Sequence, residues 1–297
     1  MKFGITPFEG SDFVNVYDVK KGLDSFTDFR FSDTIMKVIE KGYEHCEISL
    51  DLFQVLPIKI SDEEKRRILN FKKKYDITFS AHFPIWSTEL ASPNKYIREG
   101  SIKSLIDSYN MFKFMEGDID VFILHPTGAF TAAFLKMDIP KNYKQFIINL
   151  FTGFAIDSVK KVIKETRIDK SKIAIENIEF PFEDTLKLIE KLKGPSLCID
   201  TAHFLAGFSG EVDLIEITKN YLDITSEIHL QDFNEGVDAD HAALGTGKNF
   251  PIEFLKIIHD YNFKGPVVFE LPFEKAYKSV QFIKEKAPYI ELPVIKL

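Results

Sequence analysis

The sequence predicts a closed (β/α)₈ barrel that takes up the whole chain of 297 residues as one domain. Short apolar runs alternate eight times with longer amphipathic segments, the order expected of strands that are each followed by a helix. Parallel strands of this kind need helical cover outside, and at this length a closed barrel is the economical arrangement. An open, doubly wound sheet is the alternative. It would place a phosphate-binding loop after an early strand, and neither G-x-G-x-x-G nor G-x-x-x-x-G-K-[ST] occurs in the sequence.

The predicted elements follow one another in a regular order. Strands are expected near residues 1–6, 46–51, 77–83, 121–126, 173–178, 196–201, 227–232 and 267–271. Helices are expected near residues 31–41, 62–75, 95–116, 142–166, 182–193, 212–222, 251–262 and 275–286. Ser61 is the expected N-cap of the second helix, with Glu64 three residues later in the capping-box pattern. No linker divides the chain, and residues 287–297 are expected to form a surface tail.

The composition narrows the class of protein. With 45% hydrophobic and 28% charged residues the chain can bury a large core, and it has no apolar run of eighteen residues that would suggest a membrane span. The start, MKFGITPFEG, lacks the features of a secretory signal, so a cytoplasmic location is expected. Cys46 and Cys198, the two cysteines, are expected to be core residues and not a disulfide. The net charge of -7 gives no overall attraction to nucleic acid.

Six of the predicted strands end in a side chain that can bind a metal ion. In a barrel, the carboxyl ends of all the strands meet on one face, so these residues are expected to cluster. His203 and His241 follow two of the strands and are expected nearby. Nitrogen and oxygen donors without cysteine suit a catalytic site for zinc, manganese or a related divalent ion. The six strand-end residues are His82, His125, Glu176, Asp200, His229 and Glu270.

Taken singly, each of these residues has an ordinary structural explanation. A His in a strand is more often a hydrogen-bonded core residue than a ligand, and an acidic residue at a strand end often caps the next helix. If all six were structural, each of these buried polar side chains would need its own hydrogen-bond or ion-pair partner at the same end of the barrel. A shared metal site is therefore favoured. His45 and His259 lack such support and are expected to be structural.

Three further residues are candidates for contacts around the site. Glu47, in CEISLD, either faces the barrel mouth and touches the substrate or pairs with a neighbouring residue. Asp232, in HLQD, is expected to orient His229 or to contact the substrate. Trp86, in FPIWSTEL, is expected to form a wall of a sugar pocket, the alternative being that it wedges into DNA.

Seven segments resemble conserved blocks of the xylose isomerase-like TIM barrels, a superfamily that includes endonuclease IV and many sugar isomerases and epimerases. They are FSAHFPIW, LASPNKYIREGS, ILHPTG, IENIE, CIDTAHFLAGF, IHLQDFNEGVDADHAALGTG and VVFELP. They extend over nearly the whole chain and are specific for the superfamily, but they do not select a branch of it.

The epimerase-like branch implies one divalent ion and proton transfer on a sugar. By that resemblance Glu176, Asp200, His229 and Glu270 hold the ion, which stabilises a cis-enediolate when a C–H proton is removed. The two glutamates then act as base and acid on opposite faces of the sugar, and His203 holds a substrate oxygen. A proton next to a carbonyl is weakly acidic, so electrophilic stabilisation and a nearby base are both needed.

The endonuclease IV branch implies three zinc ions and cleavage of abasic DNA. By that resemblance His82, His125 and Glu176 hold one ion, the four residues of the epimerase-like set hold a second, and His203 and His241 hold a third with an aspartate. Three features depart from this branch: the aspartate is displaced to Asp240 or Asp238 or is missing, no arginine follows the second strand, and the loop from His229 to His241 is short.

The sequence therefore predicts a metal-dependent isomerase or epimerase that acts on a small sugar or sugar phosphate. One to three ions are expected, with zinc or manganese favoured. The alternative is an endonuclease IV-like phosphodiesterase, and only then would nucleic acid be a partner. A barrel that binds a ligand without turnover is a third reading. No membrane association is expected.

Overall fold

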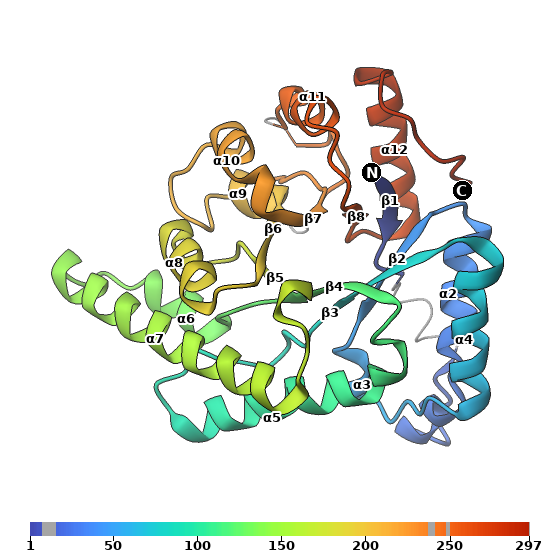
Figure 1. Cartoon of the computed structure of the whole chain (residues 1–297), viewed down its shortest axis with the longest axis horizontal. Coiled ribbons are helices and arrows are strands. Elements are labelled where there is room, and N and C mark those ends of the chain that lie inside the picture. Colours follow the sequence, from blue (N-terminus) through green and yellow to red (C-terminus); the bar gives the residue numbers. More distant parts are fainter. Residues whose placement is uncertain (8–15, 237–240, 248–249, 297) are drawn as a thin grey trace.

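Eight parallel strands close into a barrel in the order in which they occur along the chain. The computed structural model describes residues 1–7, 16–236, 241–247 and 250–296 (Figure 1). The strands are β1 (Lys2–Ile5), β2 (His45–Ser49), β3 (Thr78–His82), β4 (Ile119–Leu124), β5 (Ile173–Glu176), β6 (Ser196–Asp200), β7 (Thr225–His229) and β8 (Pro266–Phe269). Each of the eight predicted strands is present, and the prediction of a closed barrel is confirmed.

The barrel closes where β1 pairs with β8, from Lys2 opposite Pro266 to Ile5 opposite Phe269. The register shifts between Phe79 and Ser80, where β3 pairs with β4, and between Leu197 and Cys198, where β6 pairs with β7. Because all strands run in the same direction, their carboxyl ends lie at one end of the barrel.

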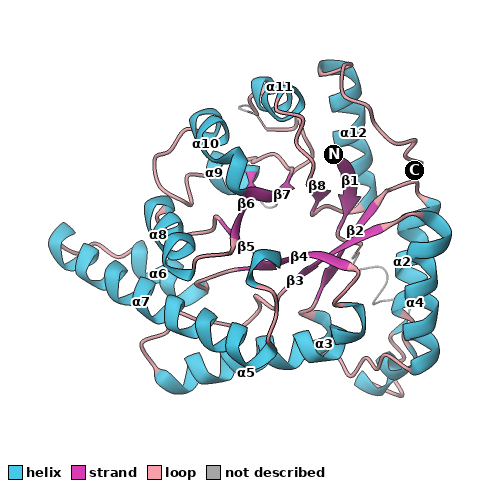
Figure 2. Cartoon of the chain, in the orientation of Figure 1, coloured by secondary structure: helices cyan, strands magenta, loops and turns pink. Residues whose placement is uncertain are grey.

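Helices surround the strands on the outside, as Figure 2 shows. They are α2 (Phe31–Glu40), α3 (Leu52–Val55), α4 (Asp62–Tyr75), α5 (Lys95–Phe112), α6 (Ala129–Leu135), α7 (Lys141–Thr166), α8 (Phe182–Leu192), α9 (Thr201–Leu205), α10 (Leu214–Tyr221), α11 (Ile252–Asp260) and α12 (Phe273–Lys286). Short 3₁₀ helices are also present, at Leu23–Asp28, Lys113–Met115, Lys170–Lys172 and Leu222–Ile224. All eight predicted helices are found, and α3, α6 and α9 are additional.

Ser61 begins α4 as predicted, since its hydroxyl accepts a hydrogen bond from the Glu64 backbone N at 3.2 Å. The second half of the capping box does not form. The Glu64 carboxylate instead accepts hydrogen bonds from the backbone N and hydroxyl of Ser32, at 3.0 and 2.7 Å. This side chain therefore joins α4 to α2 and does not close its own helix.

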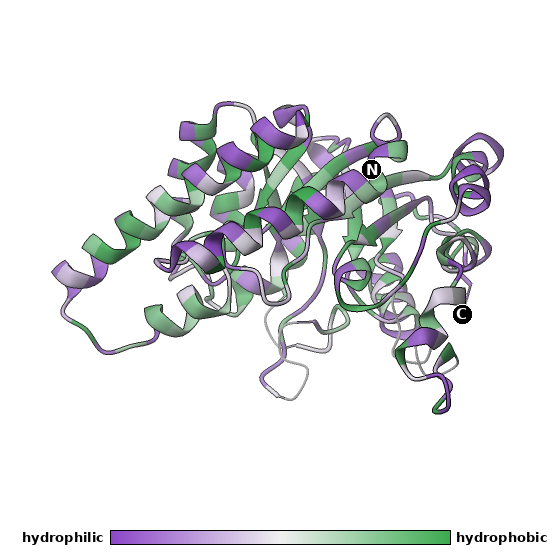
Figure 3. Cartoon of the chain, turned by 90° about the horizontal axis from the view of Figure 1, so that it is seen from below, coloured by the Kyte–Doolittle hydropathy of each residue, from purple (hydrophilic) through white to green (hydrophobic). Residues whose placement is uncertain are grey.

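The main hydrophobic core lies between the strands and the helices, and many of its largest side chains are phenylalanines. Figure 3 shows hydrophobic and hydrophilic residues alternating along the outer helices, as expected of helices with one face on the barrel. Cys46 and Cys198 are buried and unpaired, which confirms that they are core residues. Among the described residues, no helix is both long and apolar enough to cross a lipid bilayer.

The inside of the barrel is divided into an apolar and a polar part. A small apolar cluster comes from β4, β5 and β6 and contains Val121, Ile123, Ala174 and Cys198. Fully or almost fully buried polar side chains come from β2, β3 and β7: His45, Glu47, Ser80 and Glu227. Glu47, Ser80 and Glu227 come from the middle of their strands, and His45 is the first residue of β2.

Candidate metal centre

The fold brings all six strand-end residues to the same end of the barrel. Four of them are the final residues of their strands, β3, β5, β6 and β7. The other two, His125 and Glu270, come one residue after β4 and β8. This convergence is what the sequence pattern predicted.

Four of these residues form one compact group around His229. Ligand atoms of Glu176, Asp200, His229 and Glu270 all lie within 4.8 Å of one another. The Nδ1 atom of His229 is 3.1 Å from Glu270 Oε2 and 3.3 Å from Glu176 Oε1. Asp200 Oδ2 is 3.9 Å from the same nitrogen. Three carboxylates gathered in a largely buried position need a compensating positive charge.

The hydrogen bonds of His229 indicate what supplies that charge. Its Nε2 donates to Glu47 Oε2 at 3.1 Å, so the neutral ring presents a lone pair at Nδ1. Nδ1 and Glu176 Oε1 are both buried without a hydrogen-bond partner. A lone pair that faces carboxylate oxygens is stable only with a proton or a cation between them. A divalent cation with nitrogen and oxygen ligands fits this set of atoms.

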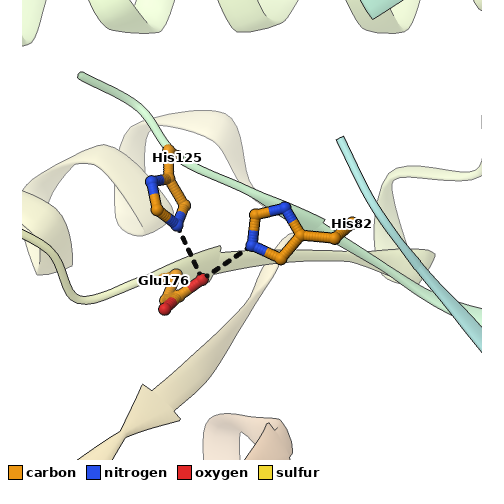
Figure 4. A group of neighbouring side chains, drawn as sticks. All are labelled: His82, His125 and Glu176. Atoms are coloured by element: carbon orange, nitrogen blue, oxygen red, sulfur yellow. Dashed lines mark hydrogen bonds and ion pairs between the residues drawn. The ribbon is translucent and has the colours of Figure 1, made fainter. Parts of the chain in front are cut away.

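Glu176 also faces a second group through its other oxygen. The Nε2 atoms of His82 and His125 lie 3.1 and 2.8 Å from Glu176 Oε2, and Figure 4 shows both rings directed at it. His82 Nδ1 donates to the Phe83 carbonyl at 2.8 Å, so its Nε2 also needs a second proton or a cation to face a carboxylate. Glu176 is therefore placed to bridge two candidate cation positions.

His203 and His241 lie at the edge of these groups. His203 Nδ1 donates to the Asn177 carbonyl at 2.7 Å, which leaves Nε2 of the neutral ring available. The two imidazole rings have centroids 6.2 Å apart, and His241 Nε2 is 3.6 Å from Glu270 Oε2. Asp238 and Asp240, the candidate aspartates for a third ion, lie outside the described residues.

Asp200 has a structural and a site contact at the same time. Its Oδ1 accepts a hydrogen bond from the His203 backbone N at 2.7 Å and caps α9. Its Oδ2 faces His229. Asp200 therefore caps a helix with one oxygen and belongs to the candidate metal centre through the other.

Gln231 and Asn177 belong to the site although the sequence pattern did not select them. The Gln231 amide donates to Asp200 Oδ2 and, at 3.3 Å, to Glu270 Oε2. The Asn177 side chain pairs with the Asp200 backbone, donating to its carbonyl at 3.1 Å and accepting from its N at 2.7 Å. Each lies one or two residues after a strand-end ligand, and that adjacency was the available signal.

Glu47 and Asp232 were candidates for contacts either with the substrate or with neighbouring residues, and in the structure both contact protein groups. Glu47 is 0% exposed, because its side chain points into the closed barrel toward His229. Asp232 accepts hydrogen bonds from the backbone N atoms of Gly245 and Gly247, at 2.9 and 3.0 Å, so it holds the glycine turn. The carboxylate that is hydrogen-bonded to His229 Nε2 is Glu47, whereas the Asp232 carboxylate is engaged by the glycine turn.

The two histidines expected to be structural lie away from the cluster. His45 is buried in the barrel, where its ring nitrogens are 2.9 Å from the hydroxyls of Thr78 and Ser80. Burial lowers the pKa of His45 to about 3. His259 is on α11 and lies beside Asp260 at 3.2 Å.

A cavity of about 640 Å³ opens above the candidate metal centre, and both Glu176 and Glu270 line it. Its walls include Ile85, Trp86 and Phe208. Trp86 is 56% exposed and also lines a neighbouring cavity of about 240 Å³. Among the described lysines and arginines, Lys136 alone lines the larger cavity, and it pairs with Glu179 at 3.1 Å.

Two buried carboxylates hold the loop that carries Trp86. Asp51 accepts hydrogen bonds from the backbone N of Ile85 at 3.0 Å and of Trp86 at 2.8 Å. Farther along the loop, Glu89 accepts from the backbone N atoms of Gly128 and Thr131, at 2.9 and 3.1 Å. The loop is thus tied to the start of α3 on one side and to the start of α6 on the other.

The loop also packs tightly against α6. A Cβ atom at Gly128 would lie 2.2 Å from the Thr88 carbonyl oxygen, so only glycine fits there. The close approach of the loop to α6 therefore depends on glycine at residue 128.

Neighbouring groups control the protonation of the site. Burial disfavours the charged form of His82, but its hydrogen bond to Glu176 and the nearby carboxylates outweigh burial and raise its pKa to about 10. Burial also opposes ionisation of Glu176, yet His125 and His229 hold the pKa of that carboxyl well below its usual value. Asp200 behaves differently, because burial raises its pKa.

We expect a divalent cation that binds at His82 to displace a proton at neutral pH. His82 is protonated below its pKa of about 10, whereas a ligand nitrogen must be neutral. Affinity for zinc should therefore rise as pH rises toward that value, by about tenfold per pH unit for each proton displaced. Calorimetry at pH 7 in two buffers with different ionisation enthalpies measures the proton release. Identical heats in the two buffers would contradict the expectation.

The fold and the cluster can be compared with known proteins. The model of the family described as xylose isomerase-like TIM barrel matches residues 36–286. No curated protein matches the chain. Among solved structures, a D-tagatose 3-epimerase-like protein is similar over 97% of this chain and 98% of its own, with 18% identity and a TM-score of 0.68.

Two other solved structures are similar to the same degree. Endonuclease IV from Thermus thermophilus has 15% identity and a TM-score of 0.66, covering 98% of this chain and 100% of its own. The 3-keto-D-glucoside 4-epimerase from E. coli has 13% identity and a TM-score of 0.65, covering 96% and 100%. At these identities the structures show the shared fold. The family match spans well over half of the chain, and the protein therefore belongs to the xylose isomerase-like TIM barrel family.

Proposed function

We propose that this protein is a metal-dependent isomerase or epimerase that acts on a small sugar or sugar phosphate. The observation that carries the proposal is the group Glu176, Asp200, His229 and Glu270 at the floor of the cavity. Two of its members, Glu176 and Glu270, line the cavity and can reach a bound molecule. Zinc and manganese are the favoured ions, because both accept this set of nitrogen and oxygen ligands.

A bound divalent cation would supply electrophilic stabilisation of the negative charge that develops on a substrate oxygen. The chain's own residues would do the rest of the chemistry. Glu176 and Glu270 would take a proton from carbon and return one, as base and acid. Gln231 would hold the Glu270 carboxylate in place, and His203 Nε2 would bind a substrate oxygen.

The shape and charge of the cavity favour a small molecule. Ile85, Trp86 and Phe208 form apolar walls, as in pockets that enclose a single ligand. A nuclease would need several phosphate contacts, and the described lining has one lysine, which is already paired with Glu179. The fold is shared by epimerases and endonuclease IV alike, so the proposal depends on the ligand group and the cavity.

A second candidate function is an endonuclease IV-like phosphodiesterase that acts on abasic DNA. It is favoured by the His82, His125 and Glu176 group, which can hold a second cation close to the first. Neighbouring cations suit phosphodiester cleavage, because they can activate water and stabilise both the attacking and the leaving oxygen. Proton transfer on a sugar needs a single ion.

Solvent deuterium exchange separates the two functions. The zinc-loaded or manganese-loaded protein is incubated in D₂O with a panel of ketoses, aldoses and their phosphates, and proton NMR follows the hydrogens next to the carbonyl group. An isomerase or epimerase should replace that hydrogen with deuterium in at least one substrate. The same preparation is tested on a duplex with one abasic site. Cleavage of the duplex without exchange in any sugar would reject the isomerase proposal in favour of the phosphodiesterase.

A further inference from the structure

Two acidic residues inside the barrel lie next to His229, on the side of its ring away from the three carboxylates of the candidate metal centre. Glu47 of β2 and Glu227 of β7 are both 0% exposed. Neither lines the two cavities at the mouth, so neither carboxylate can reach a substrate. Two buried carboxylates are costly to retain unless they serve a purpose or are fully paired. Their contacts show that they differ in what they touch.

Glu47 is held at both of its oxygens. Thr6 of the β1 end donates its hydroxyl to Glu47 Oε1 at 2.7 Å. Glu47 Oε2 accepts from His229 Nε2 at 3.1 Å. The carboxylate is therefore fixed between β1 and β7 and presents one oxygen to the imidazole ring.

Glu227 occupies the same layer without making that contact. Its Oε1 accepts a hydrogen bond from the Ser80 hydroxyl at 2.8 Å. The same oxygen is 4.0 Å from His229 Nε2, beyond hydrogen-bond distance. Glu227 thus resembles Glu47 in type and burial and contacts Glu47 itself, but it makes no hydrogen bond to the ring.

We propose that Glu47 is a positioning residue for the metal centre, which fixes the ring and the tautomer of His229 so that Nδ1 faces the cation. With Nε2 donating to Glu47, the lone pair of the neutral ring is at Nδ1, 3.1 to 3.9 Å from the three carboxylates of the centre. A carboxylate on the far nitrogen also makes an imidazole a stronger ligand, and loss of such a partner typically weakens metal binding by about 10-fold to 100-fold. The inference concerns metal binding and does not depend on which substrate the protein uses.

Metal affinity in three variants tests the inference. Glu47→Leu keeps the volume and removes the acceptor, and we expect its dissociation constant for zinc, measured by competition with a chelator, to rise by about 10-fold to 100-fold. Glu47→Gln retains an amide oxygen that can accept from Nε2, so its loss should be smaller. Glu227→Gln is the comparison variant, because it changes a buried carboxyl group of the same layer that contacts Glu47 but makes no hydrogen bond to the ring, and its dissociation constant should rise less than that of Glu47→Leu.

The outcomes separate a positioning role from a general structural one. Equal losses in the Glu47 and Glu227 variants would mean that any damage to the buried layer weakens the centre, and the inference would be wrong. Unchanged affinity in both Glu47 variants would also overturn it while leaving the proposed function intact. A native protein that binds no divalent cation would overturn both.

A measurement on the native protein keeps the test independent of variant folding. In the zinc-loaded, ¹⁵N-labelled protein, long-range proton–nitrogen correlation spectra distinguish the protonated ring nitrogen from the metal-bound one. Comparison with His229→Asn identifies the signals of His229. We expect the proton on Nε2, and a proton on Nδ1 would overturn the inference.

Discussion

Replacement of Glu176 by Gln is expected to reduce turnover severely while the barrel remains folded. Glu176 lines the cavity and faces two candidate cation positions, one through each oxygen. The amide keeps the size of the side chain but removes its charge, its ability to take a proton, and one ligand oxygen. We expect kcat/KM to fall by about 10³-fold, within the range of general acid–base effects, and metal affinity to fall as well. Kinetic assays on the substrate found by deuterium exchange measure the loss.

A matched substitution separates this effect from the loss of a negative charge in general. Glu183→Gln removes an exposed carboxylate from the first turn of α8, away from the cavity, and should retain native turnover. Circular dichroism should show both variants folded. Native activity in Glu176→Gln would reject its role as ligand and base.

The double variant His82→Ala, His125→Ala is expected to lower the metal content of the protein. If both imidazoles are ligands, the native protein should contain more than one equivalent of divalent metal, and the variant about one equivalent less. The group Glu176, Asp200, His229 and Glu270 is unchanged in the variant and should still bind one ion. Elemental analysis of dialysed protein gives the count.

The control for this experiment is His259→Ala, which removes an exposed imidazole from α11 and should leave the metal content unchanged. One equivalent in both the native protein and the double variant would show that His82 and His125 are structural. The same variant also compares the two functions, because a sugar isomerase needs only the remaining ion, whereas a phosphodiesterase of the endonuclease IV type should lose cleavage.

The sequence predicted the barrel well because apolar runs and amphipathic segments alternate with clear boundaries. Three short helices were missed, and the reason is their length: α3, α6 and α9 have four, seven and five residues. Such segments are too short to show the periodic apolar pattern on which helix prediction depends. α9 also begins directly after the strand-end residue Asp200, so no loop separates the two elements.

The convergence of the candidate site followed from topology, whereas its hydrogen-bond partners did not. Parallel strands place their carboxyl ends together, so one acidic or imidazole residue per strand end was enough to predict a cluster. Sequence spacing does not give the direction of each side chain. Glu47 was therefore equally consistent with the mouth and the interior, and the partner of His229 proved to be Glu47 in place of Asp232. Gln231 donates hydrogen bonds to both Asp200 and Glu270, which are far apart in the sequence. These contacts could not be predicted without the three-dimensional structure.

The anchoring of Trp86 by Asp51 and Glu89 has a consequence for the thermodynamics of ligand recognition. If Trp86 stacks on a sugar as proposed, its backbone is already held by hydrogen bonds and loses little conformational freedom on binding, so the entropic penalty of association is small. Asp51→Ala would remove the hydrogen bonds to the backbone of Ile85 and Trp86. The loop would then lose more conformational freedom on binding, and the sugar would bind more weakly.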